Sequence, residues 1–348
     1  MHRIAVIPGD GIGPEVIEQG IRILEKTAKL CHFELAFIHF PWGANHYLKS
    51  GEILPTHALE NLRTHDAVYL GAIGDPRVPP GVLERGIVGA LRWTLDLYVN
   101  LRPVKLYNAD YSPLKEIRPS DLDILVVREN TEDIYTGPSG FIKKETADEM
   151  ALAIAFYSRK GVERILRYAF QAARERRKKL TLCDKANAIP AQELWRRVFE
   201  EIGKEFPDIE RQVIYVDACA MAMVRRPQDF DVIVTTNLFG DILTDLGAEL
   251  CGGMGVAPSA NIFPGEFGVF EPIHGSAPKY AGTGKANPIG AILAGAMMLE
   301  FLGEKKGATL IESATVEALQ TKKLSSLGAG ANLDTKEIGS LIESYLKV

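Results

Sequence analysis

The feature that most constrains the fold is a repeated alternation of short apolar runs with longer amphipathic segments. Runs rich in β-branched residues, such as residues 3–9 and 67–73, alternate with segments such as 14–30, whose apolar residues recur every three or four positions. The first pattern is typical of buried strands and the second of helices. Because the alternation continues to about residue 250, it predicts an α/β chain with much parallel sheet.

Composition narrows the class of protein. The chain has 348 residues, 46% of them hydrophobic, which is enough for a large core with a cleft. A net charge of −5 gives no electrostatic footprint for nucleic acid or an anionic membrane. The longest apolar stretch, residues 288–303, contains Glu300 and is shorter than the roughly 20 residues of a membrane span. We therefore expect neither nucleic acid nor a membrane as a partner.

Cysteine usage and the chain start predict a cytoplasmic protein. The four cysteines are dispersed without a C-x-x-C pair, so neither a disulfide framework nor a thiolate zinc site is indicated. No basic-then-apolar leader opens the sequence.

The glycine-rich motif "PGDGIGPE", residues 8–15, follows the first predicted strand. Its spacing is G-x-G-x-G, not the G-x-G-x-x-G of dinucleotide-binding turns. We interpret it as a tight strand-to-helix turn with Pro14 at the first helical position.

The segment "TTNLFGDILTDLGAE", residues 235–249, carries Asp241 and Asp245 four residues apart in an otherwise apolar helical pattern. Their repulsion costs a few tenths of a kcal/mol. Two interpretations stay open from the residues alone: a solvated acidic face, or a bound cation. Together with Asp217, these aspartates would form a hard oxygen site suited to Mg²⁺ or Mn²⁺.

Several other polar residues stand at predicted element ends. Three of these residues are arginines, and Arg85 is a fourth candidate. If the arginines converged, they would bind a dicarboxylate. An isolated arginine, however, is usually a surface residue. A tyrosine at the start of a loop, such as Tyr135, is more often a packing residue than a functional one. A lysine at the end of a strand, such as Lys185, is more often simply solvated. Ligands gather beyond the carboxyl ends of parallel strands, which favours a functional role for Lys185 and Asp217. The three arginines are Arg92, Arg102 and Arg128.

Taken together, these motifs resemble one enzyme family. "PGDGIGPE", "LDLYVNLRP", "VVRENTEDIY", "DKAN", "VDACAM", "DVIVTTNLFGDILTDL", "GVAPSANI" and "FEPIHGSAPKYAGTGKANP" occur in consistent order from about residue 4 to residue 303. They are similar to the metal-dependent β-decarboxylating dehydrogenases of 2-hydroxy acids, which include 3-isopropylmalate, isocitrate, homoisocitrate, D-malate and tartrate dehydrogenases. The resemblance implies an isopropylmalate dehydrogenase-like fold of two α/β domains sharing a long mixed sheet, not a Rossmann fold. Residues 1–97 and 252–348 would form the cofactor-binding domain, and residues 98–251 the metal-binding and dimerisation domain.

The resemblance also implies roles for individual residues. Asp241 and Asp245 would hold Mg²⁺ or Mn²⁺ together with Asp217 from the second subunit of a homodimer, so that each active site is shared. Tyr135 and Lys185 of the partner subunit would be the acid–base pair. The remaining residues would bind a 2-hydroxy dicarboxylate substrate: Arg92, Arg102, Arg128, Val88 and Asp217.

The cofactor implied by the resemblance is NAD, with NADP as an alternative. NAD-dependent members usually carry an Asp after "SAP", where this chain has Lys279 followed by Tyr280. A cation and a phenol at these positions would favour a 2′-phosphate, whereas Ala286 is typical of NAD-dependent members. The residues implied to contact the dinucleotide are Ile12, Asn187, Glu271, His274, Gly275, Ala277, Lys279, Tyr280 and Asn287.

Substrate choice depends on the helix before Arg92. Isocitrate-specific members have a Ser and an Asn six and four residues before that arginine, where this chain has Gly86 and Val88. An apolar pocket suits an alkyl group and would leave a carboxylate unpaired. We therefore expect oxidative decarboxylation of 3-isopropylmalate to 2-oxoisocaproate, as in leucine biosynthesis. Gly89, in place of a usual leucine, predicts room for a larger substituent.

Two alternatives stay open. One is another substrate of the same family: D-malate, tartrate, isocitrate or homoisocitrate. The other is a non-catalytic regulatory subunit, which would be expected to lose a metal-binding or acid–base residue. This chain keeps all of those residues.

Overall fold

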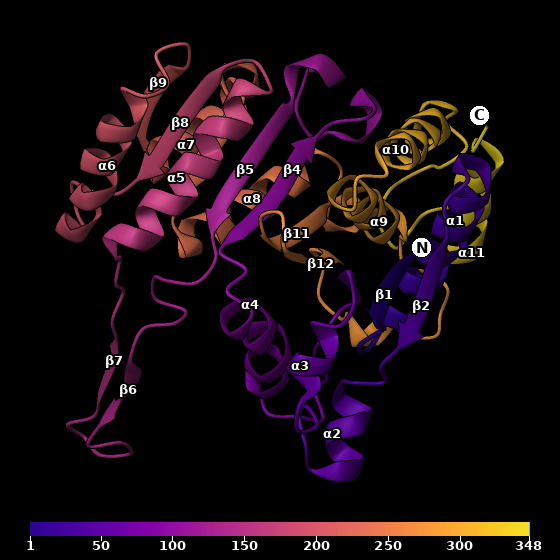
Figure 1. Cartoon of the computed structure of the whole chain (residues 1–348), viewed down its shortest axis with the longest axis horizontal. Helices are drawn as coiled ribbons and strands as arrows, with labels where there is room; N and C mark the ends of the chain where they lie inside the picture. Colours follow the sequence, from indigo (N-terminus) through magenta and orange to yellow (C-terminus); the bar gives the residue numbers. More distant parts are fainter. Residues whose placement is uncertain (348) are drawn as a thin grey trace. The chain divides into compact units, whose positions relative to one another are not determined.

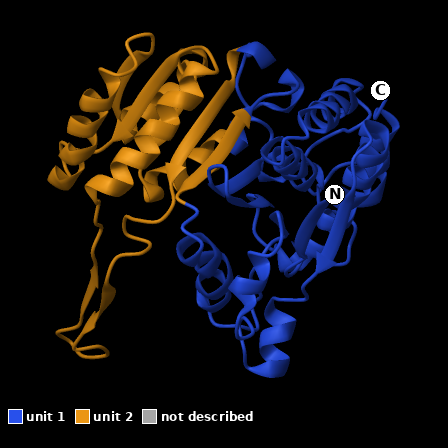
Figure 2. Cartoon of the chain, in the orientation of Figure 1, with its two compact units in different colours: residues 1–97, 105–120, 248–348 blue, residues 98–104, 121–247 orange. Residues whose placement is uncertain are grey.

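The computed structural model describes residues 1–347, which form two compact units (Figure 2). Unit 1 comprises Met1–Leu97, Lys105–Ser120 and Ala248–Val348, and unit 2 comprises Tyr98–Val104 and Asp121–Gly247. The sequence-based division gave residues 105–120 to the middle domain, but they contact residues of unit 1. For example, the hydroxyls of Tyr111 and Ser112 donate to the carbonyls of Leu324 and Leu250.

Unit 1 is an α/β layer structure whose strands lie in the order β2-β1-β3-β12-β11. β1 pairs in parallel with β2 and β3, β12 pairs in parallel with β3, and β11 pairs antiparallel with β12. Its strands and longer helices are β1 (His2–Ile7), α1 (Gly13–Cys31), β2 (Leu35–His39), α2 (Ala44–Ser50), α3 (Ala58–Leu62), β3 (Ala67–Leu70), α4 (Ala90–Thr94), β11 (Pro258–Phe263), β12 (Phe267–Pro272), α9 (Ile289–Phe301), α10 (Lys305–Gln320) and α11 (Thr335–Ser344).

The longest apolar stretch of the sequence, residues 288–303, contains α9. This helix is buried nearly all round, because α1 and α10 pack on it on one side and β11 and β12 on another (Figure 1). In residues 1–347, no helix has the length and apolar character that a membrane crossing requires.

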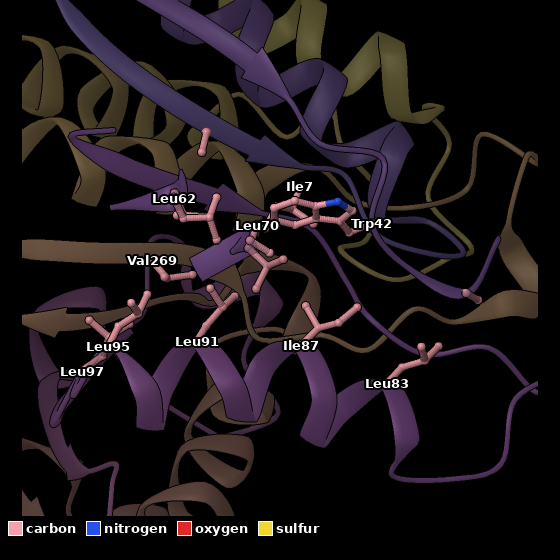
Figure 3. Close-up of a cluster of buried hydrophobic side chains, with 14 of the residues drawn as sticks. Ile7, Trp42, Leu62, Leu70, Leu83, Ile87, Leu91, Leu95, Leu97 and Val269 are labelled. Carbon is pink, nitrogen blue, oxygen red and sulfur yellow. The ribbon is translucent and has the colours of Figure 1, made fainter. Parts of the chain in front are cut away.

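An apolar core cluster of unit 1 packs against the helical segment that carries Arg92. This segment begins as a π-helix, Glu84–Gly89, and continues as α4. Its residues Leu83, Ile87, Leu91 and Leu95 point to the side where Leu70, Val269 and Trp42 lie (Figure 3). Because this face is buried, the neighbouring face that carries Val88 and Arg92 has a fixed direction.

Unit 2 has the strand order β4-β5-β10-β8-β9, in which β10 is parallel to β5 and β8, and β9 is parallel to β8. Its elements are β4 (Val99–Lys105), β5 (Asp123–Glu129), β6 (Ser139–Ile142), β7 (Met150–Ala153), α5 (Arg159–Arg174), β8 (Lys179–Asp184), α6 (Glu193–Gly203), β9 (Glu210–Tyr215), α7 (Val216–Arg225), β10 (Val232–Thr235) and α8 (Asn237–Leu250). Short 3₁₀ helices in the two units are Ala109–Tyr111, Pro119–Asp121, Pro190–Gln192, Pro227–Asp229, Met254–Val256 and Pro278–Tyr280.

One part of unit 2 projects from the rest as an arm. β6 and β7 pair antiparallel, and every residue of both strands is exposed (Figure 1). Phe141, Met150 and Leu152 are large apolar side chains on this arm. An isolated two-stranded ribbon is marginally stable in water, so such a surface favours a partner.

The predicted fold class is confirmed. Within residues 1–347, ten strands belong to one mixed sheet, and β6 and β7 form a separate two-stranded sheet. The motif "PGDGIGPE" forms the predicted tight turn, with Pro14 in the first turn of α1. Gly11 has φ +57°, and a Cβ there would lie 1.9 Å from the carbonyl oxygen of Ser276, so only glycine fits.

Candidate active site

Asp241 and Asp245 lie one turn apart on the solvent-facing side of α8. The opposite side of the helix is buried through Phe239 and Leu243. The side chain of Asp241 is 37% exposed and that of Asp245 is 55% exposed. Both therefore keep oxygens that a ligand can reach.

Arg128, from the end of β5, contacts the first of these carboxylates. It is buried, and its Nη1 donates to Oδ1 of Asp241 at 2.5 Å. Its Nε and Nη2 donate to Oδ1 of Asn237 at 3.0 and 2.7 Å. A Cβ at Gly240 would meet the Arg128 side chain at 2.5–2.9 Å, so glycine allows α8 to pack on this arginine.

Arg102, from β4, lies between the two carboxylates. Its Nη1 is 3.4 Å from Oδ1 of Asp241 and 3.7 Å from Oδ1 of Asp245. The same nitrogen donates to the hydroxyl of Thr244 at 2.8 Å. These cations offset the repulsion of the aspartates, and the cluster contains two of the three arginines expected to bind substrate carboxylates.

The two aspartates respond differently to this environment. Partial burial favours the neutral form of both. For Asp241, the nearby Arg128 and Arg102 outweigh burial and lower the pKa. For Asp245, burial raises the pKa, and the charge of Asp241 adds to this effect.

Tyr135 lies in the same cluster. Its hydroxyl donates to Oδ2 of Asp241 at 3.0 Å, and the guanidinium of Arg128 is 5.7 Å from its ring centroid. Burial, followed by the charge of Asp241, raises the pKa of Tyr135 to about 12. The phenol therefore carries its proton at neutral pH and can act as a proton donor.

Lys185 and Asp217 form a separate pair. Lys185 follows β8, Asp217 lies in the first turn of α7, and Nζ of the lysine is 2.5 Å from Oδ1 of the aspartate. The hydrogen bond from Lys185 lowers the pKa of Asp217, whose side chain is 62% exposed. The structure of the single chain therefore pairs Asp217 with Lys185.

Within one chain, Asp241 and Asp245 supply only part of a site for a hard divalent cation. Asp241 and Asp245 offer accessible carboxylate oxygens, the ligands that Mg²⁺ and Mn²⁺ prefer. However, residues 1–347 contain no group of three or more His, Cys, Asp or Glu arranged to hold a metal. The expected third ligand, Asp217 from a second subunit, stays a prediction.

In unit 1, Arg92 is held by an acidic partner. Its Nη2 donates to Oε1 of Glu271 at 2.9 Å, and Nδ2 of Asn261 donates to the same oxygen at 2.8 Å. The expected contact of Glu271 with the cofactor stays a prediction, and in the structure its carboxylate orients Arg92. Arg85, the fourth arginine candidate, is exposed on the π-helical turn.

The helix face next to Arg92 is apolar. Val88 is half-buried and packs on the core cluster, and the space beside Gly86 is filled by Ile53, whose side chain would lie 2.5 Å from a Cβ there. A Cβ at Gly89 would lie 2.8 Å from the ring of Trp93. The room expected from Gly89 is thus occupied by an indole.

The predicted cofactor loop in unit 1 is a compact turn. Ile12 N–H donates to the carbonyl of Ser276 at 2.9 Å, which ties the glycine-rich turn to this loop. His274 is buried and contacts the Gly275 carbonyl at 3.0 Å through Nδ1, while its Nε2 has no hydrogen-bond partner among residues 1–347. Burial lowers the pKa of His274. Its ring is therefore neutral near pH 7.

Other predicted cofactor residues flank this turn. Ala277 adopts a left-handed conformation, and Nζ of Lys279 lies 4.7 Å from the ring centroid of Tyr280. Asn287 donates to the carbonyl of Leu327 at 3.0 Å. Asn187, which belongs to unit 2, is exposed after β8.

Sequence reasoning missed three residues of these clusters: Asn237, Thr244 and Trp93. Asn237 and Thr244 lie on α8 within four residues of Asp241, so helical spacing could have identified them. Trp93 lies four residues after Gly89 and follows the same spacing.

Comparison with known proteins gives consistent matches. The family model described as isocitrate/isopropylmalate dehydrogenase matches residues 3–342. A 3-isopropylmalate dehydrogenase of Thermobifida fusca is 49% identical over 324 residues, which is 92% of each chain. One from Corynebacterium jeikeium is 44% identical, over 99% of this chain and 100% of the other. The crystal structure of isocitrate dehydrogenase from Methylococcus capsulatus matches with a TM-score of 0.90 and 40% identity over 100% of both chains.

Proposed function

The chain belongs to the isocitrate/isopropylmalate dehydrogenase family, and on this premise we propose that it converts 3-isopropylmalate to 2-oxoisocaproate by oxidative decarboxylation, with reduction of NAD(P). The observation that carries the choice of substrate is the apolar surface of Ile53 and Val88 beside Arg92. A third carboxylate, as in isocitrate, would lie there without a donor, at a cost of several kcal/mol. An isopropyl group would instead be buried favourably.

The contacts of the polar residues support the following roles. Arg102 and Arg128 present guanidinium groups suited to the substrate carboxylates, and Arg92 is oriented by Glu271. Lys185 of the partner subunit accepts the proton of the substrate hydroxyl. Tyr135, which keeps its proton at neutral pH, donates it to the enol carbon after CO₂ has left. When bound, the divalent cation supplies Lewis acidity at the hydroxyl and carbonyl oxygen, and the nicotinamide supplies the hydride acceptor.

A homodimer with shared active sites is part of this proposal. Apolar side chains on α7 and α8 are exposed in the single chain: Met221 at 64%, Ile242 at 57% and Val224 at 42%. The arm of β6 and β7 adds further exposed apolar residues. A second copy that covers α7 and α8 would bring its own Asp217 and Lys185 towards this surface, which supports Asp217 as the third metal ligand.

The cofactor and compartment are also inferred. Lys279 and Tyr280 lie together on the turn of the predicted adenosine site, and a cation there supports a role for NADP beside NAD. None of the four cysteines forms a disulfide within residues 1–347, which supports a reducing cytoplasm.

A steady-state assay tests the substrate. The purified enzyme is assayed with 3-isopropylmalate, isocitrate, D-malate and tartrate, each with NAD and with NADP. We expect kcat/KM for 3-isopropylmalate to exceed that for isocitrate by at least about a hundredfold. Activity should vanish after chelation and return with Mg²⁺ or Mn²⁺. A preference for isocitrate, D-malate or tartrate would refute the substrate assignment, and loss of turnover with all four acids would favour a non-catalytic subunit.

A charge-reversal variant tests the cofactor inference. Lys279→Asp should lower kcat/KM for NADP relative to NAD by about tenfold or more, because the 2′-phosphate loses its cation. Lys285→Asp is the matched control, since Lys285 is an exposed lysine that makes the same charge change outside the predicted contact residues. Equal effects of the two variants would contradict a contact between Lys279 and the 2′-phosphate.

A further inference from the structure

A partly buried hydrogen-bond chain in unit 2 connects the segments that carry Lys185 and Tyr135. The backbone N–H of Lys185 donates to Oε1 of Gln192 at 2.7 Å. Nε2 of Gln192 donates to the hydroxyl of Tyr157 at 2.9 Å, and this hydroxyl donates to Oδ1 of Asp133 at 2.9 Å. Gln192 is fully buried and Asp133 nearly so. None of these three side chains takes part in the proposed chemistry.

The chemistry of the groups allows only one direction for this chain. A backbone N–H can only donate, so Oε1 of Gln192 must face Lys185, and the amide nitrogen must face Tyr157. The hydroxyl of Tyr157 then accepts a hydrogen bond from the amide and donates one to Asp133. Burial raises the pKa of Tyr157, so that proton stays in place. Each buried atom is satisfied only while its neighbours are present.

Asp133 is the junction at the other end of the chain. Its Oδ2 accepts from the N–H of Leu238 at 2.9 Å, in the first turn of α8, the helix that carries Asp241. Its carbonyl accepts from the N–H of Gly137 at 3.1 Å, which closes the turn that contains Tyr135. The backbone of Asp133 has φ +73°. This left-handed conformation costs energy in a residue other than glycine, and it persists where the surrounding contacts hold the backbone in place.

We propose that Gln192, Tyr157 and Asp133 are positioning residues, which hold the backbone of Lys185, the turn of Tyr135 and the start of α8 in one fixed arrangement. This inference rests on the proposed function, in which Tyr135 and Lys185 transfer protons. In the proposed function, Lys185 acts in the partner's active site and Tyr135 acts in the active site of its own subunit. The hydrogen-bond chain therefore connects residues of two active sites within one protomer. A displacement of about 1 Å at such groups lowers the rate by about a hundredfold.

The test removes one partly buried hydroxyl from the dimeric enzyme. Tyr157→Phe deletes two links of the chain without changing the shape of the ring. The matched control is Tyr69→Phe, which likewise deletes a hydrogen-bonded tyrosine hydroxyl, here a fully buried one, since Tyr69 donates to the carbonyl of Ala291 at 2.6 Å within unit 1. We expect Tyr157→Phe to lower kcat by more than about tenfold with KM changed less than about threefold. Tyr69→Phe should lower the melting temperature but leave kcat unchanged.

A second substitution keeps the test decisive if Tyr157→Phe folds poorly. Gln192→Met keeps the length of the side chain but has no amide, so it interrupts the chain at another link. If both residues act through one chain, the double variant should lose no more kcat than the more affected single variant, because the effects are not additive. Unchanged kcat in both folded single variants, or losses that multiply in the double variant, would overturn the proposal.

Amide hydrogen exchange gives a readout that does not depend on turnover. In the wild-type enzyme the amide of Lys185 is protected by Gln192, so peptides that contain Lys185 should exchange faster in Tyr157→Phe but not in Tyr69→Phe. Equal exchange in the two variants would refute the inference even if no acid of the panel were a substrate. Conversely, a different preferred acid would refute the proposed substrate and leave this prediction as it stands.

Discussion

Lys185 and Asp217 form an ion pair of 2.5 Å within one chain, between the end of β8 and the start of α7. The other candidate catalytic groups, Tyr135 in the turn after β5 and Asp241 on α8, form a hydrogen-bonded cluster of their own with Arg128. Each chain thus carries two separate groups of candidate catalytic residues. If a second copy supplies Lys185 and Asp217 to the cluster of Tyr135 and Asp241, variants defective in one group should complement variants defective in the other.

Subunit complementation tests this arrangement. We expect Asp217→Asn and Asp241→Asn to be inactive as homodimers. A purified mixed dimer of the two should recover about half of wild-type activity, because one of its two sites contains only wild-type residues. The control is a mixed dimer of Asp217→Asn with Lys185→Met, in which both sites are defective and no recovery is expected. An inactive mixed dimer in the first case would contradict the shared site.

Stability at acidic pH should depend on His274. Burial lowers its pKa in the folded state below the value of about 6.5 in the unfolded chain. Above that pH the ring is neutral in both states. As the pH falls below it, the unfolded chain binds a proton that the folded state excludes, so stability is lost at up to about 1.4 kcal/mol per pH unit. Urea unfolding at pH 7.5, 6.5 and 5.5 should therefore show a steeper loss for wild type than for His274→Gln. Parallel curves would show that His274 does not titrate in this way.

The α/β class, the tight turn at residues 8–15 and the helix of Asp241 could be predicted because each has a local signal. Apolar periodicity, glycine spacing and Pro14 all act within a few residues. The hydrogen-bond chain through Gln192 and Tyr157 could not be predicted, because it connects segments that are far apart in the sequence. Neither Gln192 nor Tyr157 belongs to a local sequence motif. The π-helical start before α4 was also missed, because the spacing of Leu83, Ile87, Leu91 and Leu95 fits a regular helix almost as well.

Trp93 should limit the size of the substrate's alkyl group. Its ring lies over Gly89, where a Cβ would come within 2.8 Å, and its side chain is the partly exposed neighbour of Arg92. Trp93→Ala should raise kcat/KM for 3-alkylmalates with groups larger than isopropyl by about tenfold relative to 3-isopropylmalate, since one added methylene contact is worth about 1–3 kcal/mol. Malate, which has no alkyl group, is the internal control. A uniform change across the series would show that Trp93 acts only on the fold.

Asp10 should stabilise the loops at the carboxyl ends of three adjacent strands. It follows β1, and its buried carboxylate accepts the N–H of Ala44, after β2, at 2.7 Å and that of Gly74, after β3, at 3.0 Å. A Cβ at Gly43 would lie 2.6 Å from Oδ1 of Asp10, so the loop is built to approach this oxygen.

Replacing this carboxylate should therefore affect both stability and the cofactor loop. Asp10→Ala leaves two buried N–H groups unpaired, at about 1–3 kcal/mol each, and should also weaken NAD(P) binding because the same turn positions Ile12 against Ser276. Asp66→Ala is the control, since Asp66 is exposed and accepts a single N–H from Arg3; its cost should stay below about 1 kcal/mol. Urea unfolding and cofactor titration measure the two effects. If Asp10→Ala were no more destabilising than Asp66→Ala, the three loops would be held by their remaining backbone hydrogen bonds, such as that from Asp10 N–H to the Ala72 carbonyl.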